Sequence, residues 1–191
     1  MRFDDLFDDL ESQLESELGA VRREVADEEE RFRVGKLELR HRIRRAPGSI
    51  EAGLRDGYRI RLQPLAVGRD WLSGEVLEGA PSGTGAVVPF SSIAGLRLDE
   101  QSAYEAALPA DDERFRLAER LSFGYVLRDF ARRRTWVRVE APQPVGGTID
   151  RVGRDHFDVA AHDCGTIRAR GNVTHIQIVP FAAVGWIRLQ P

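Results

Sequence analysis

The first stretch of the chain carries a helical pattern of apolar positions. Apolar residues recur there at steps of three or four: Phe3, Phe7, Leu10, Leu14, Leu18, Val21 and Val25. This spacing places them on one face of an α-helix, so we predict a long charged helix within residues 1–46. Gly19 and Gly35 weaken the helix locally. The Ala46-Pro47-Gly48-Ser49 segment ends it.

The apolar stripe of this helix is narrow, and its other faces are heavily charged. Residues 1–30 carry twelve acidic and three basic side chains, and residues 31–45 carry seven basic and one acidic. Such a pattern is typical of a coiled coil or of a helix laid on a partner. The seven residues of the stripe are therefore a candidate partner-binding face. A helix packed on the rest of its own chain is the alternative, and the pattern alone does not choose between the two.

The remainder of the chain alternates with the period of β-strands, interrupted by one further helix. The predicted strands cover residues 58–62, 71–77, 86–88 and 95–98, and then 136–140, 148–152, 156–161, 175–179 and 184–189. Between these two groups, apolar residues at Phe123, Val126, Leu127, Phe130 and Ala131 have helical spacing. We predict an amphipathic helix over about residues 113–133.

The two groups of strands share sequence. Val88-Pro89-Phe90-Ser91-Ser92-Ile93-Ala94-Gly95-Leu96-Arg97-Leu98 returns as Val179-Pro180-Phe181-Ala182-Ala183-Val184-Gly185-Trp186-Ile187-Arg188-Leu189, and Val67-Gly68-Arg69-Asp70 returns as Val152-Gly153-Arg154-Asp155. An internal repeat favours two related modules. We therefore predict an α+β fold with two repeated small antiparallel β-barrels of SH3-like or Sm-like type, each preceded by a helix. The predicted organisation is a long N-terminal helix over 1–46, a first barrel over 47–100, a loop and helix over 101–134, and a second barrel over 135–191.

Two resemblances support small β-barrels. The Gly147-x-Ile149…Asp155…Asp158 hairpin, followed by Arg170-Gly171-Asn172-Val173, resembles the two motifs of the Sm-like fold, whose members often bind RNA and form rings. The Val-Pro-Phe…Ile-Arg-Leu ending of each copy is similar to the closing strands of PRC-type barrels. We take the barrel topology from these resemblances, and not RNA binding.

The chain as a whole also resembles a family of uncharacterised proteins from high-GC Gram-positive bacteria. The resemblance runs from Phe3-Asp4-Asp5-Leu6-Phe7 through Gly147-Thr148-Ile149-Asp150-Arg151-Val152-Gly153-Arg154-Asp155. Some members of that family carry the label "Fis family transcriptional regulator". A Fis-type protein ends in a helix-turn-helix, whereas this chain is predicted to end in strands, so its residues do not support the label.

Composition and cysteine usage indicate a globular protein of the cytoplasm. The chain has 191 residues, of which 42% are apolar and 31% charged, with a net charge of −3. Cys164 is the single cysteine, so no intrachain disulfide can form and a reducing compartment is favoured. The acidic N-terminal stretch lacks the features of a secretory signal. No apolar run is long enough for a membrane span, and we predict no membrane association.

The residues do not form a recognisable catalytic or metal motif. His156, His162, Cys164 and His175 lie close in sequence, but their spacing matches no zinc motif and the first repeat copy lacks them. We therefore predict no metal site, no cofactor, no small-molecule substrate and no catalytic residue, and we expect that the protein is not an enzyme.

Arginines supply the remaining candidate chemistry. The chain has 27 arginines and one lysine, and arginine suits phosphate geometry. Candidate nucleic-acid contacts are Arg40, Arg42, Arg44 and Arg45 after the first helix and Arg128, Arg132, Arg133, Arg134, Trp136 and Arg138 around the second. Our first hypothesis is a non-enzymatic adaptor or regulatory protein that associates with itself or a protein partner through the N-terminal helix. The alternative is an RNA- or DNA-binding regulator that uses these arginines.

Overall fold

The computed structural model describes residues 18–19, 22–81, 83–108 and 118–190. The chain divides into two compact units, residues 1–38 and residues 39–191. In the first unit, residues 22–35 form a helix, and nearly all of its side chains are exposed. The second unit holds every described strand.

A continuous helix through residue 46, predicted from the apolar stripe, does not form. The helix ends after Gly35, where the amides of Lys36 and Leu37 donate to the carbonyls of Arg33 and Val34 over three residues. Such tightened bonds close a helix end, and glycine favours the break. A separate helix, α2 (Leu39–Arg45), follows in the second unit. The predicted coiled coil is also wrong: the described part of residues 1–38 contains one helix with no second helix along it.

The predicted pair of separate β-barrels is wrong as well, because all ten strands form one antiparallel sheet. The strands are β1 (Ile50–Leu54), β2 (Arg59–Val67), β3 (Trp71–Glu78), β4 (Gly85–Pro89), β5 (Ile93–Arg97), β6 (Trp136–Glu140), β7 (Val145–Val152), β8 (His156–Ala161), β9 (His175–Pro180) and β10 (Trp186–Leu189). Their order in the sheet is β5-β1-β2-β3-β4-β10-β6-β7-β8-β9. We call β1–β5 the first half and β6–β10 the second half.

The pairing of β4 with β10 makes the sheet continuous. Ile187 lies opposite Val87, and Leu189 lies opposite Gly85. Each of these strands alone would leave a row of unpaired backbone groups at an edge, and the pairing satisfies both rows. Side chains cross the same junction. Val87 belongs to the hydrophobic core of the second half, and Trp186 belongs to the core of the first half.

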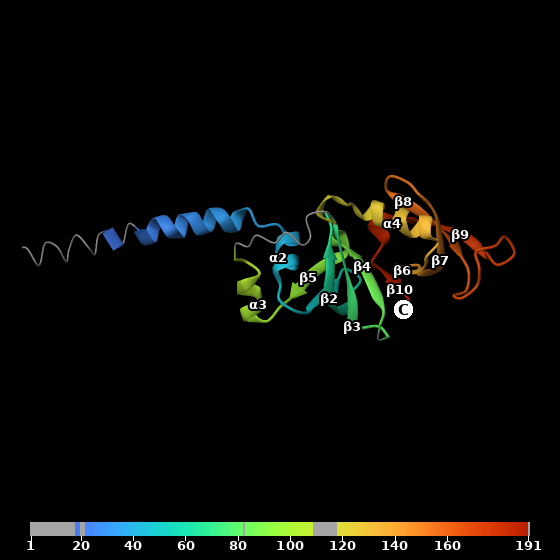
Figure 1. The fold of residues 1–191 in the computed structure, drawn as a ribbon, viewed down its shortest axis with the longest axis horizontal. Coiled ribbons are helices and arrows are strands. Elements are labelled where there is room, and N and C mark those ends of the chain that lie inside the picture. The colour runs from blue at the N-terminus through green and yellow to red at the C-terminus, as the bar shows by residue number, and fades with distance from the viewer. Residues whose placement is uncertain (1–17, 20–21, 82, 109–117, 191) are drawn as a thin grey trace, which may run out of the picture. The chain divides into compact units, whose positions relative to one another are not determined.

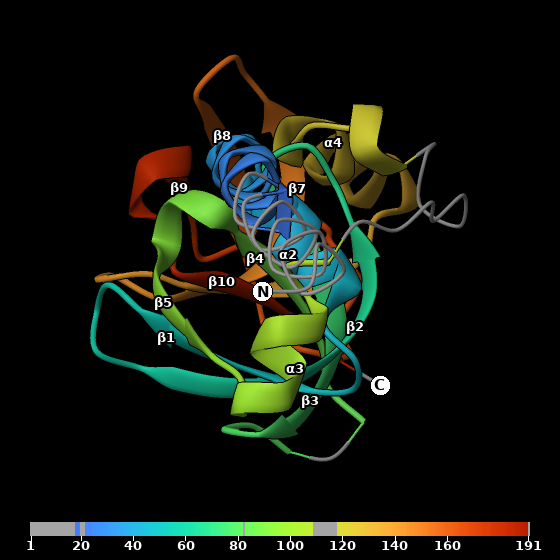
Figure 2. The ribbon, with the colours of Figure 1, turned by 90° about the vertical axis from the view of Figure 1, so that its left-hand side faces the viewer.

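One helix covers each half of the sheet. Ile43 of α2 is buried in the first core, and α2 contacts β2. Phe123 and Leu127 of α4 (Phe123–Arg133) are buried in the second core, and α4 contacts β7. Figure 1 shows α2 beside the first half and α4 beside the second. A further short helix, α3 (Glu100–Glu105), lies next to α2 in Figures 1 and 2. The Arg42 side chain of α2 donates to the Ala103 carbonyl of α3.

Both repeated motifs have a structural explanation. In each half a 3-10 turn follows the strand-ending proline: η1 (Phe90–Ser92) and η4 (Phe181–Ala183). The amide of Phe90 donates to the carbonyl of Asp70 at 2.9 Å, and the amide of Phe181 donates to the carbonyl of Asp155 at 2.7 Å. The Val-Gly-Arg-Asp turn of each half therefore binds the start of its Val-Pro-Phe turn.

The glycine of each Val-Gly-Arg-Asp turn lies close to a side chain three residues later, the buried Trp71 in the first half and the exposed His156 in the second. A Cβ atom on Gly68 would lie 2.1 Å from the indole nitrogen of Trp71, and one on Gly153 would lie 2.7 Å from the ring of His156.

The Asp70 carboxylate has a second role, because it accepts a hydrogen bond from the amide of Phe123 at 2.7 Å. It thereby caps α4, which begins at Phe123, whereas the predicted helix began at about 113. Residues 109–117 lie outside the described part of the chain.

Candidate functional site

Exposed apolar side chains lie on the helix over residues 22–35 and at Leu18 before it. Leu18 is 47% exposed, Val25 50% and Phe32 67%. The seven-residue spacing of Val25 and Phe32 places them on one face of the helix over residues 22–35, and Leu18 precedes Val25 by the same spacing. We call these three residues the apolar stripe. Phe32 was missing from the predicted face although its spacing from Val25 was readable in the sequence. Phe3, Phe7, Leu10, Leu14 and Val21 of that face lie outside the described residues.

Charged side chains flank the apolar stripe. The described helix begins with Arg22 and Arg23 and continues with the acidic run Asp27, Glu28, Glu29 and Glu30. Arg33 hydrogen-bonds the Glu30 carboxylate, and this bond lowers the pKa of Glu30. Lys36 places its ammonium 3.8 Å from the centre of the Phe32 ring, a cation–π geometry. The stripe is therefore an exposed apolar surface in a mainly acidic setting.

The candidate arginines of α2 contact other parts of the second unit. Arg42 donates to the Ala103 carbonyl at 2.8 Å, and Arg45 donates to the Leu108 carbonyl at 2.6 Å. Arg44 forms an ion pair with Glu119, and both side chains are largely buried. Arg40, on the same helix, is also engaged in an interaction. These side chains tie α2 to the segment that follows β5.

The candidate residues around α4 are engaged in the same way. Arg132 and Arg133 both pair with Asp129, and the hydrogen bond from Arg132 is the main cause of the lowered pKa of Asp129. The other four also have intrachain acceptors: Arg128 donates to the Gly153 carbonyl, Arg134 to Asp150, Arg138 to Glu140 and Trp136 to the His162 carbonyl. The arginines of α2 and those around α4 lie on different halves of the sheet (Figure 1).

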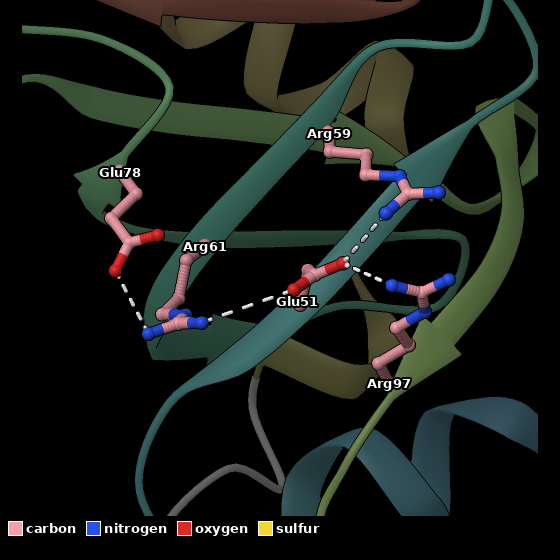
Figure 3. A network of polar contacts seen from close by, with 5 residues as sticks. All are labelled: Glu51, Arg59, Arg61, Glu78 and Arg97. Carbon is pink, nitrogen blue, oxygen red and sulfur yellow. Dashed lines mark hydrogen bonds and ion pairs between the residues drawn. The ribbon is translucent and has the colours of Figure 1, made fainter.

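A charged network that the sequence analysis missed crosses the first half (Figure 3). Glu51 of β1 lies opposite Arg97 of β5 on one side and Arg61 of β2 on the other, and Arg61 lies opposite Glu78 of β3. The four residues form a row of alternating charge across four strands. Arg59, two residues before Arg61 in β2, also approaches Glu51. Only the strand register brings these five residues together, so their sequence spacing gave no signal.

The network joins strands and does not form an enclosed site. The Arg61–Glu78 pair is 2.8 Å long, but the three contacts of Glu51 with Arg59, Arg61 and Arg97 measure 3.8, 3.9 and 3.4 Å. Exposed pairs of this kind contribute about 0–1 kcal/mol each. Three arginines face two glutamates, so the charges of the network nearly cancel. Opposite charges across paired strands favour the observed register.

The histidines and the cysteine do not converge. His156 hydrogen-bonds the Asp155 carboxylate, and this bond lowers the pKa of Asp155. His162 is buried, with Nε2 2.8 Å from Thr148 Oγ1, and Cys164 donates to Gln190. Within the described residues, no three His, Cys, Asp or Glu side chains are arranged to hold a metal ion. Among the same residues, no helix has the length and apolar character needed to cross a membrane.

Comparison with protein-family models, with curated proteins and with solved structures gave no match to this chain. The resemblance to a family from high-GC Gram-positive bacteria therefore stays a prediction.

Proposed function

We propose that this protein is a non-enzymatic adaptor or regulatory protein of the cytoplasm that binds a protein partner through the apolar stripe. The observation that carries the proposal is the exposure of Val25 and Phe32 along one face of the helix over residues 22–35, with Leu18 also exposed. Burial of such side chains against a partner is worth about 1.5–3 kcal/mol each.

The composition of the two hydrophobic cores supports a binding role for this segment. Every buried residue of either core comes from position 43 or later. The helix of residues 22–35 therefore contributes no residue to either core, and its apolar side chains are exposed.

The charge of the segment indicates the chemistry of the partner. Residues 1–30 carry a net charge of −9. Two such segments side by side would repel each other, whereas a partner with basic groups around an apolar groove would be attracted. We therefore expect an apolar surface with a basic rim on the partner.

The experiment is co-purification of the full-length protein from its native cells, with and without nuclease. The test variant is Val25→Glu/Phe32→Glu, and the control is Leu65→Glu, which places the same charge at another exposed apolar position, in β2. The proposal expects specific protein partners that resist nuclease, persist with the control and are lost with the test variant. Retention of all partners by the test variant would overturn it.

Nucleic-acid binding through the arginines of α2 and α4 is the second candidate. Nine of its ten residues have a named intrachain partner, and the tenth, Arg40, is also engaged in an interaction. Binding phosphates there would require exchange of these acceptors. Loss of all co-purifying material on nuclease treatment would favour this candidate over the protein partner.

A further inference from the structure

The sheet ends in two unpaired strands, β5 at one end and β9 at the other (Figure 1). β9 runs His175-Ile176-Gln177-Ile178-Val179-Pro180 and contains no Asp, Glu, Lys or Arg. Natural edge strands are usually protected from pairing by charges or by early prolines. β9 has only the proline at its end. Ile176 is 49% exposed and Ile178 65% exposed, so this edge is both open and apolar.

The repeat identifies what such an edge binds. β9 corresponds to β4, because Val179-Pro180-Phe181 corresponds to Val88-Pro89-Phe90. By the same alignment β5 corresponds to β10, and Ile178 corresponds to Val87. Val87 is only 2% exposed, because β4 pairs with β10 and places Val87 opposite Ile187. At the two ends of the sheet, β9 has no partner of the β10 type and β5 has no partner of the β4 type.

We propose that β9 of one molecule pairs with β5 of a second copy of this chain, in the register in which β4 pairs with β10. Ile187 corresponds to Leu96, Arg188 to Arg97 and Leu189 to Leu98. The pairing Ile187–Val87, Arg188–Ala86 and Leu189–Gly85 therefore becomes Leu96–Ile178, Arg97–Gln177 and Leu98–Ile176 between molecules. The register sets both exposed isoleucines against leucines.

A pocket beside β5 fits this pairing. It has a volume of about 410 Å³ and is lined by Ile43 of α2, by Leu96 and Leu98 and by neighbouring residues. Val87 of β4 is buried in the core of the second half, together with Ile187 of β10 and with Phe123 and Leu127 of α4. The pocket lies between the counterparts of these elements, β5 and α2. It is thus the place where an incoming Ile178 would become buried.

The contact is head-to-tail, because it joins one end of a sheet to the opposite end of another. A pair of molecules retains one free β5, on one molecule, and one free β9, on the other, so association continues until a ring closes or a filament forms. This surface is separate from the apolar stripe, and it would make the protein present several copies of that stripe to its partner.

Self-association is tested by sedimentation of the full-length protein over a concentration series. The wild type is expected to form species larger than a dimer, and Ile178→Lys is expected to remain a monomer. The control is Ile167→Lys, at a position that is 82% exposed and lies outside every strand; it is expected to associate like the wild type. The proposal fails if the wild type is monomeric throughout the series or if Ile178→Lys associates normally.

Cross-linking tests the register and the head-to-tail geometry. In a Cys164→Ser background, Arg97→Cys and Gln177→Cys are oxidised separately and after mixing. Opposed residues of paired strands have Cα atoms about 4.5–5.5 Å apart, within disulfide range. A disulfide-linked dimer is expected only in the mixture. Equal cross-linking of either variant alone would show a two-fold symmetric contact and overturn the proposal. The absence of cross-linking in the mixture would also overturn it.

Discussion

Equivalent positions of the two halves of the sheet differ sharply in burial. Trp71 and Val87 of the first half are buried, whereas their counterparts in the second half, His156 and Ile178, are exposed. The local backbone is the same in both, with the same turn and the same proline before a 3-10 turn. The difference arises because the second half packs against the first at β4, whereas β9 pairs with β8 and its other edge has no strand partner in the described chain. Neighbouring structure therefore decides burial at these positions.

The largest effect is expected from truncating Trp71. Trp71→Ala removes a buried ring and the hydrogen bond from its indole nitrogen to the Leu121 carbonyl, and it should lower the free energy of unfolding by about 3–5 kcal/mol. His156→Ala, at the equivalent exposed position, should change it by less than about 0.5 kcal/mol. Urea unfolding of both variants measures the contrast. Equal losses would show that the two positions have the same environment.

Val87 and Ile178 provide a second pair. Val87→Ala should cost about 2 kcal/mol, because it removes two buried methyl-sized groups from the junction of β4 and β10. Ile178→Ala should cost less than about 0.5 kcal/mol in dilute monomer. Denaturant titrations at low and high protein concentration separate this intrinsic effect from self-association. A large loss for Ile178→Ala at low concentration would place Ile178 in the core of the monomer.

A buried polar pair distinguishes the second half from the first. Thr148 Oγ1 and His162 Nε2 are 2.8 Å apart and buried, whereas the residues at the equivalent positions, Gln63 and Leu77, are exposed. Thr148→Val leaves the histidine nitrogen without its partner and should cost about 1–2 kcal/mol. Gln63→Ala should be nearly neutral. Thermal unfolding followed by circular dichroism compares them, and a neutral Thr148→Val would mean that water replaces the hydroxyl.

The smallest effect concerns α3, which has no counterpart in the second half. Ser102 donates through its hydroxyl and its amide to the Asp99 carboxylate, and these bonds lower the pKa of Asp99. The folded state therefore favours the ionised form. The ionised Asp99 carboxylate stabilises the folded state fully above the ordinary carboxyl pKa, and this stabilisation is lost as the pH falls through the lowered pKa. The amide protection factors in α3, taken relative to the intrinsic exchange rate at each pH, should fall over that acidic range in the wild type. Asp99→Asn, which keeps a capping oxygen, should not show this pH dependence.

The sequence allowed prediction of elements more readily than of their assembly. Nine of the ten strands overlap predicted β-type runs, although β2 extends to Val67 beyond the predicted 58–62 and β7 begins at Val145, before the predicted 148–152. The strand β1 was missed because Ile50-Glu51-Ala52-Gly53-Leu54 is short and includes Ala and Gly, which have low strand propensity. The α3 helix was also missed, although Asp99 is a favourable N-cap residue.

The junction of the halves could not be predicted from spacing, although one signal for it was present. Ala86-Val87-Val88 is a continuous apolar run, which is typical of a strand buried on both faces. A strand of an isolated small barrel would instead alternate. The same reasoning applies to the candidate site: the separation of Val25 and Phe32 is visible in the sequence, but the five residues of the charged network meet only through the register of four strands.

The position of β10 in the sheet has a consequence for synthesis of the protein. β10 is the last strand in chain order, yet it lies in the interior of the sheet between β4 and β6. At about 5–20 residues per second, translation from the end of β4 to β10 takes about 5–20 seconds. During this interval the nascent first half exposes the β4 edge and Val87, and any neighbouring nascent chain can pair with it. Polysome crowding on one messenger would therefore favour strand exchange between sibling chains.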